Sequence, residues 1–186
     1  TNAQGERVTL PLVERPRKVL VAGDSVALGA MIDDRDTIAS QLEELSAQSA
    51  VAHGTLVIGI TPGTLPALVR RLKSEWQFDM LLDVTAIDWP QREPRFDVVW
   101  HFYSTQHKVR VRVKTQVTEA DPVVDSLTSL YGAAGFLERE CHEMYGIRFR
   151  GNADLRPILL YEGFVGYPLR KDYPKQAEQP LVPYRE

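Results

Sequence analysis

Residues 138–143 read Glu-Arg-Glu-Cys-His-Glu and form the densest cluster of potential metal ligands and proton carriers in the chain. On a helix, Glu138 and His142 would share one face at positions i and i+4, and two such side chains could begin a metal site. The spacing differs from the helical His-Glu-x-x-His zinc motif, however, and no other histidine lies near. We therefore expect these charged side chains to pair with Arg148, Arg150 or a partner.

A second segment has the residue types to present a nucleophile. Gly23-Asp24-Ser25 followed by Gly29 matches the G-D-S-x-x-x-G block of serine hydrolases of the lipase and esterase kind. The serine of such an enzyme needs an adjacent base. That base would come from an Asp-x-x-His pattern late in the chain, and none of the four histidines has an aspartate three residues before it. The favoured interpretation is a turn after a strand at 18–22, and esterase activity at Ser25 is a remote alternative.

A basic stripe is predicted on one face of a strand over residues 108–114, where Lys108, Arg110, Arg112 and Lys114 alternate with valines. Neighbouring strands offer aspartates on the same face, namely Asp79, Asp83 and Asp97. Cross-strand charge pairing on a solvated sheet is the favoured interpretation. Nucleic-acid binding by this stripe is the alternative, and the stripe lacks the interleaved aromatics that stack bases.

The composition limits the classes of function further. The 186 residues are 44% hydrophobic and 25% charged, as in an ordinary globular domain, and the net charge of −3 gives no general attraction to phosphate. The chain has no G-x-G-x-x-G, no P-loop and a single cysteine, Cys141. It therefore lacks the motifs expected for binding a dinucleotide, a nucleoside triphosphate or an iron–sulfur cluster. The longest apolar stretch, 19–32, is interrupted by Asp24, so no membrane-spanning helix is expected. The first residues, from Thr1, do not have the basic and then apolar pattern of a secretion signal, so an intracellular location is expected.

The elements that must position these residues follow from hydrophobic periodicity. Helical spacing predicts helices from Asp36 to about Leu45 and over 65–76, and strands are expected at 55–60, 78–89, 96–102 and 108–114, the last three as an antiparallel meander. The strand at 78–89 is expected to bury Phe78, Met80, Leu82, Val84 and Ala86.

The C-terminal third is predicted to contain two helices and then a long irregular segment. Asp121-Pro122 reads as the start of a helix that buries Val124, Leu127 and Leu130 and ends at Gly132, and a second helix spans 136–145. Beyond Gly146 the periodicity disappears, while prolines, glycines and aromatics accumulate. Such a segment, rich in side chains that seek burial, is expected to lie against a surface.

Three blocks in order carry a family resemblance: residues 137–147, then Gly151 with Asp154-Leu155-Arg156, then residues 163–174, Gly-Phe-Val-Gly-Tyr-Pro-Leu-Arg-Lys-Asp-Tyr-Pro. Together they resemble the signature of the 30-kDa (C) subunit of proton-pumping NADH:quinone oxidoreductase, respiratory complex I. The resemblance covers roughly residues 36–174. Glu143 stands where that family usually has Asp, Pro157 where a second Arg often follows, and Asn152 and Tyr167 where His is common.

The resemblance implies a non-catalytic subunit of the hydrophilic arm with no cofactor of its own, in a complex whose other subunits hold FMN and iron–sulfur clusters. Its implied partners are the 49-kDa-type (D) subunit and the iron–sulfur subunits, on the cytoplasmic face of the bacterial inner membrane or the mitochondrial matrix side. The alternative within the same family is the equivalent subunit of an energy-converting or formate-linked [NiFe]-hydrogenase.

The expected architecture is α+β, a two-layer arrangement with a mixed or antiparallel sheet covered on one face by helices, plus an extended tail. We divide it into an N-terminal extension (1–35), a domain (36–146) and a partner-binding tail (147–186). Extended backbone that presents arginine and aromatics suits a permanent interface. The residues expected at that interface are Glu138, Arg139, Glu140, Tyr145, Asp154, Arg156, Pro168, Leu169, Arg170, Lys171, Asp172, Tyr173 and Pro174.

Overall fold

The computed structural model describes residues 48–52 and 55–176. Its elements in chain order are β1 (Gln48–Ala52), β2 (Thr55–Ile60), the 3-10 turn η1 (Pro62–Thr64), α3 (Leu65–Ser74), β3 (Met80–Asp88), β4 (Phe96–Ser104), β5 (Val109–Val117), β6 (Val123–Asp125), α4 (Ala134–Tyr145) and β7 (Arg148–Arg150). The strand predicted at 18–22, the helix predicted from Asp36 and the Ser25 block lie outside the described residues.

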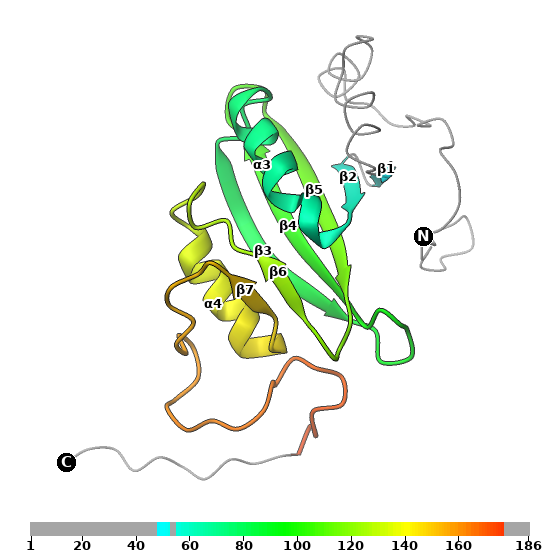
Figure 1. The fold of residues 1–186 in the computed structure, drawn as a ribbon, viewed down its shortest axis with the longest axis vertical. Coiled ribbons are helices and arrows are strands. Elements are labelled where there is room, and N and C mark those ends of the chain that lie inside the picture. Colours follow the sequence, from blue (N-terminus) through cyan, green and yellow to red (C-terminus); the bar gives the residue numbers. More distant parts are fainter. Residues whose placement is uncertain (1–47, 53–54, 177–186) are drawn as a thin grey trace, which may run out of the picture.

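The main sheet has five strands in the order β1-β2-β5-β4-β3. Strands β3, β4 and β5 form the predicted antiparallel meander, while β2 runs parallel to β5 and β1 antiparallel to β2. Figure 1 shows α3 and α4 on the same side of this sheet. The predicted α+β class, with a mainly antiparallel sheet covered by helices on one face, is confirmed.

The core lies between α3 and the sheet because each contributes one apolar face. Leu65, Leu68, Val69 and Leu72 fall on a single stripe of α3 and have no exposed surface. They join alternate residues of the strands in one cluster that includes Ile58, Trp100, Phe102 and Val113. Burial of this apolar surface is the main contribution to the stability of the domain.

The register of β3 corrects the predicted burial of its first half. Leu81 is 6% exposed, whereas Met80 and Leu82, which were predicted to be buried, are 44% and 39% exposed. The pairing with β4 shifts between Leu81 and Asp83. Such an irregularity moves every following side chain to the other face, so Val84 and Ala86 are buried as predicted.

The helix predicted over 122–132 is wrong. Residues 123–125 form strand β6, which pairs in parallel with β7, and a turn follows. The Ser126 hydroxyl accepts a hydrogen bond from the Thr128 N–H at 3.1 Å, which offers the backbone an alternative to the helix. Val124 and Leu127 are both buried. Their separation by three residues imitated a helical stripe.

The predicted pairing of the basic stripe with aspartates is not direct, and Asp97 acts on Lys114 only as a nearby opposite charge. Among the described residues, no ion pair joins Lys108, Arg110, Arg112 or Lys114 to Asp79, Asp83 or Asp97. Asp79 instead accepts hydrogen bonds from the Thr105 N–H and hydroxyl, and Asp97 pairs with Arg92. Opposite Arg112 the β4 strand places His101, whose ring offers no negative charge, so the strand register itself prevents pairing there.

The part of the chain that the structure describes contains no helix with the length and apolar character that crossing a bilayer demands.

The β3 register makes a direct prediction about stability. Leu81→Ala should lower the free energy of unfolding by about 2 to 4 kcal/mol, because it empties a core position. Leu82→Ala, its matched control one residue away, should change it by less than about 1 kcal/mol. Urea denaturation followed by circular dichroism measures both values. Equal losses would contradict the register.

Candidate partner interface

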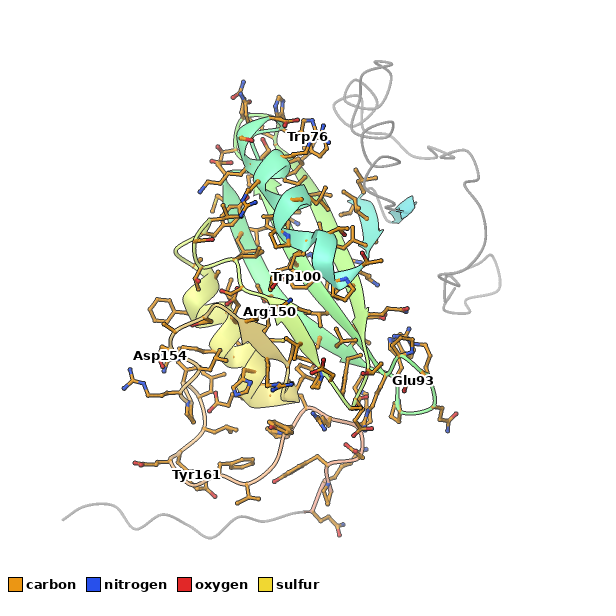
Figure 2. The ribbon with its side chains drawn as sticks, viewed as in Figure 1. Trp76, Glu93, Trp100, Arg150, Asp154 and Tyr161 are labelled. Carbon is orange, nitrogen blue, oxygen red and sulfur yellow. The ribbon has the colours of Figure 1, made fainter. Side chains whose placement is uncertain are left out.

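Strand β7 is followed by an irregular segment, residues 151–174, which we name the strap. Figure 2 shows it leaving the side of α4 near Asp154, passing Tyr161 and ending near the loop between β3 and β4 that carries Glu93. The strap has no regular secondary structure, in agreement with the sequence. Its conformation is set by side chains of the domain that bind its backbone.

The outward face of α4 holds the first half of the strap. The Arg139 guanidinium donates to the carbonyl oxygens of Arg156 and Pro157, each at 2.9 Å. The Glu143 carboxylate accepts hydrogen bonds from three successive backbone N–H groups, those of residues 158, 159 and 160, at 3.2, 2.9 and 2.7 Å. A charge-assisted contact of this kind satisfies backbone donors that an irregular segment would otherwise leave to water.

Glu138 lies inside the fold. It has no exposed surface, and its carboxylate accepts hydrogen bonds from the Leu127 N–H at 2.7 Å, the Ser126 hydroxyl at 2.8 Å and the Asn152 amide at 2.9 Å. Burial raises the pKa of Glu138, although the three hydrogen bonds act in the opposite direction. This carboxylate therefore joins the turn after β6 to the start of the strap.

The C-terminus of α4 approaches the strap closely at Gly146. This residue has a φ of 79°, and a Cβ built on it would lie 2.7 Å from the Arg170 guanidinium and 2.7 Å from the Tyr167 ring. Arg170 donates from Nε to the Tyr145 carbonyl oxygen at 2.7 Å, while its guanidinium stacks 4.4 Å from the Tyr167 ring centre. The glycine that ends the helix therefore also makes room for the strap.

Arg95 holds the end of the strap against the sheet. Its Nε and Nη2 donate to the two carboxylate oxygens of Asp88, at 2.7 and 2.8 Å. The same guanidinium pairs with Asp172 of the strap at 2.9 Å and with Glu119 at 2.8 Å. Asp88 in turn accepts from the Lys171 backbone N–H at 2.7 Å. Arg95 thus connects three carboxylates from three separate segments.

The electrostatics of this cluster favour its charged form. Burial tends to raise the pKa of Asp88, but the hydrogen bonds from Arg95 and Lys171 outweigh it and lower the pKa below the ordinary 3.8. The pKa of Asp172 is also lowered, chiefly by its hydrogen bond with Arg95. The pKa of Arg95 is raised by Asp88 and Asp172, so this cation stays protonated at every accessible pH.

The outer surface of the strap is apolar. Val165 and Leu159 are 72% and 62% exposed, and the remaining exposed apolar side chains of the strap are Ile158, Tyr161, Tyr167 and Leu169. On α4, Phe136 is 63% exposed and shares the face of Arg139 and Glu143, because the three lie at i, i+3 and i+7. Exposed apolar side chains in this number on one helix and its adjoining segment are typical of interaction sites. We name Phe136 and the six strap residues the apolar surface.

The predicted interface residues divide into two groups. Glu138, Arg139, Tyr145 and Arg170 take part in hydrogen bonds that hold the strap and are buried or half-buried, and Pro168 is half-buried. Glu140, Arg156, Leu169, Lys171, Asp172 and Pro174 are exposed, while Asp154 and Tyr173 are half-buried. The sequence did not single out Asp88 and Arg95. The only hint in the sequence was that opposite charges stand at the end of one predicted strand, Asp88, and just before the next, Arg95.

No group of three or more His, Cys, Asp or Glu side chains suitable for a metal ion occurs among residues 48–52 and 55–176. Glu138 and His142, considered above as a starting pair, have other partners. Glu138 binds the Leu127 N–H, and the His142 Nδ1 lies 2.8 Å from the Ile147 carbonyl oxygen.

The two arginines of β7 do not pair with the charged helix as the sequence suggested. Arg148 binds Asp121 and Arg150 binds Asp125, each at 2.8 Å. The parallel pairing of β7 with β6 brings these aspartates beside the arginines, whereas Glu138 and Glu143 of α4 bind the turn after β6 and the strap.

Comparison with known sequences gives consistent similarities. Residues 58–179 match the family described as the 30 Kd subunit of the respiratory-chain NADH dehydrogenase. The (C) subunit of the NADH-quinone oxidoreductase of Agrobacterium fabrum is 48% identical over 126 residues, 67% of this chain and 62% of that protein. Its counterpart in Geotalea uraniireducens is 37% identical over 148 residues, 80% of this chain and 88% of that protein. The chain therefore spans less than two thirds of the Agrobacterium relative.

Two solved structures share the fold. The trypsin-resistant fragment (1-134) of Nqo5 superimposes with a TM-score of 0.59 and 26% identity, covering 63% of this chain and 96% of the fragment. A chain from the membrane-bound sulfane sulfur reductase, an archaeal respiratory membrane complex, gives a TM-score of 0.65 and 26% identity, covering 75% of this chain and 85% of that chain.

Gly146 provides a test of the close approach. Gly146→Ala should displace Tyr167 and Arg170 and lower the free energy of unfolding by about 1 to 3 kcal/mol, because it adds a clash to the backbone strain of a positive φ. Gly163→Ala is the matched control, since Gly163 has a φ of 92° and no atom within 4 Å of its Cβ position. Urea denaturation, with tyrosine fluorescence as the probe, compares the two. A larger loss for Gly163→Ala would contradict the geometry.

The lowered pKa of Asp88 predicts a pH dependence. A carboxyl group whose pKa is lower in the folded state contributes stability above its unfolded pKa and loses it as the pH falls through the folded pKa. Asp88→Asn should therefore cost about 3 kcal/mol at pH 7, and the difference from the wild type should shrink below pH 3.8. Asp121→Asn, in an exposed pair with Arg148, should cost less than about 1 kcal/mol at both pH values. Urea titrations at pH 7 and pH 3 measure the differences.

Proposed function

We propose a function from one premise: the chain belongs to the family of the 30-kDa subunit of the respiratory-chain NADH dehydrogenase. The resemblance carried by residues 137–174 is thereby confirmed. In our proposal the protein is a hydrophilic-arm subunit of NADH:quinone oxidoreductase. It contributes to electron transfer by holding other subunits in position, and no reaction takes place on the chain itself.

The apolar surface carries this proposal. Side chains as large as Phe136 and Leu159 remain exposed although the domain has a well-filled core of its own. An irregular segment kept in one conformation while its apolar side chains face outward is arranged for docking on another protein, since monomers seldom leave such patches uncovered. The flanking Arg156 and Lys171 add a polar rim.

The buried charges of the described domain support a scaffolding role. Glu138 and Glu143 bind backbone or side-chain donors of the turn after β6 and of the strap, and Asp88 binds Arg95 and the Lys171 N–H. Each of these three carboxylates is thus committed to a structural contact. None of the three is left with an unpaired charge, which is the arrangement expected of an acid or base in an active site.

The partners in this proposal are the 49-kDa-type subunit and the iron–sulfur subunits of the complex, which would also hold the FMN and the clusters. The complex would present this subunit on the cytoplasmic face of the bacterial inner membrane. The relatives at 37% and 48% identity are both named as the (C) subunit of NADH-quinone oxidoreductase, which favours this assignment.

A second candidate is the equivalent subunit of another membrane-bound redox complex, such as a [NiFe]-hydrogenase. The similarity to a chain of the archaeal sulfane sulfur reductase favours keeping it, because the same fold occurs there in a different respiratory complex. The native complex purified through this subunit decides between them. Flavin with NADH oxidation supports the first proposal, and nickel with hydrogen evolution supports the second.

Charge placed on the apolar surface should prevent assembly. We expect Leu159→Asp to reduce recovery of this subunit in the native complex at least tenfold, because a carboxylate buried at an interface without a partner is costly. The isolated variant should unfold at the same urea concentration as the wild type. Blue-native electrophoresis of membrane extracts measures the recovery.

Met80→Asp is the matched control for this experiment, because Met80 is an exposed apolar residue outside the strap. Its recovery in the complex should equal that of the wild type. Full recovery of Leu159→Asp would remove the apolar surface from the proposal.

A further inference from the structure

The strap is attached to the domain at two ends, and the two attachments differ. The first half is bound through its backbone by Arg139 and Glu143 of α4. The second half is bound at the sheet end, where Arg95 pairs with Asp172 and Asp88 binds the Lys171 N–H. Between these ends lies Val165, the most exposed member of the apolar surface. The orientation of that surface therefore depends on both attachments.

The guanidinium of Arg95 makes two contacts with Asp88 at the end of β3 and two with Asp172 of the strap. It donates to both oxygens of Asp88 and pairs with both oxygens of Asp172, at 3.0 and 2.9 Å. The side chain of Arg95 is almost fully enclosed, while that of Asp172 is 55% exposed. Bidentate geometry fixes direction as well as distance, so the position of the strap follows from that of Asp88.

The neighbouring Arg170 extends this arrangement along the strap. Its guanidinium lies 5.0 Å from the Phe96 ring centre, and that of Arg95 lies 5.0 Å from the same ring. Glu119 stands between the two cations, 2.8 Å from Arg95 and 3.6 Å from Arg170. The carboxylates offset the repulsion between two arginines that share one aromatic ring. Residues 167–173 thereby form one connected unit with the sheet end.

We propose that Arg95 is a positioning residue for docking: by clamping Asp172 onto Asp88 it orders residues 167–173 before a partner binds. This inference rests on the proposed function for the step from an ordered strap to assembly. A segment that is already ordered loses less conformational entropy on binding, so its partner binds more tightly. A strap detached at this end would keep its apolar side chains but present them in many orientations.

A purely structural role for Arg95 predicts something different. The pair with Asp88 lies inside the domain, and loss of Arg95 would leave that buried carboxylate unpaired and weaken the whole fold. Asp172 separates the two roles, because Asp172→Asn leaves the pair between Arg95 and Asp88 complete. The clamp therefore predicts a local effect of Asp172→Asn, confined to the strap.

The test measures hydrogen–deuterium exchange of the full-length chain, with the Lys171 amide as reporter because it binds Asp88 directly. Asp172→Asn should raise the exchange rate of this amide about fivefold or more, while the amides of residues 158–160, bound by Glu143, keep their rates. Arg95→Gln should raise it further. The matched control is Asp121→Asn, which removes an exposed aspartate–arginine pair of 2.8 Å elsewhere and should change neither set.

The same variants are then assayed for recovery in the native complex. Faster exchange of the Lys171 amide in Asp172→Asn, together with reduced recovery and an unchanged urea midpoint, supports the inference. An unchanged exchange rate overturns the clamp, whatever happens to assembly. Faster exchange with full recovery overturns the link between strap order and docking, and so counts against the proposed function at this end of the strap. Exchange that accelerates across the whole domain assigns Asp172 a general structural role and also overturns the inference.

Discussion

The arrangement of the C-terminal segment depends on one steric condition, the absence of a Cβ at Gly146. Helix α4 ends there in a left-handed conformation, and the space beside it is filled by Tyr167 and Arg170, atoms of which lie within 2.7 Å of where a Cβ would be. Because Gly146 has no side chain, Arg170 can donate to the Tyr145 carbonyl oxygen, and the Leu169 N–H can donate to the Met144 carbonyl oxygen. The helix end and the strap are therefore one packing unit.

Buried or half-enclosed carboxylates provide the contacts that a regular ladder of hydrogen bonds provides elsewhere. Glu138 satisfies donors of the turn after β6 and of Asn152, Glu143 satisfies three strap amides, and Asp88 satisfies Lys171. Each carboxylate has several acceptor positions, so one side chain can serve donors that arrive from segments far apart in sequence. Irregular backbone is stable here because charged acceptors compensate for the secondary structure it lacks.

The sequence revealed the elements whose periodicity was unambiguous and missed those set by contacts at long range. Helix α3 and strands β4 and β5 were predicted because Leu65, Leu68 and Leu72, or the valines of β5, repeat at the period of one element. Strand β6 was mistaken for a helix because its short run is stabilised by β7, which lies more than twenty residues later. The register shift in β3 left Met80 and Leu82 exposed and Leu81 buried, in a way that no local pattern indicates. Asp88 lies only seven residues from Arg95, but the other two partners, Glu119 and Asp172, lie 24 and 77 residues away, so inspection of the local segment could not reveal the whole cluster.

Glu143 recognises the strap only through backbone N–H groups, and this has a consequence for how interface specificity can evolve. Nothing in that contact depends on the identity of the side chains at residues 158 and 159, which point outward. Substitutions there can change the shape and chemistry presented to a partner while the backbone path stays the same. At residues 158 and 159 the backbone path and the exposed side chains are therefore set by different residues, so the recognition surface can change there without loss of the fold.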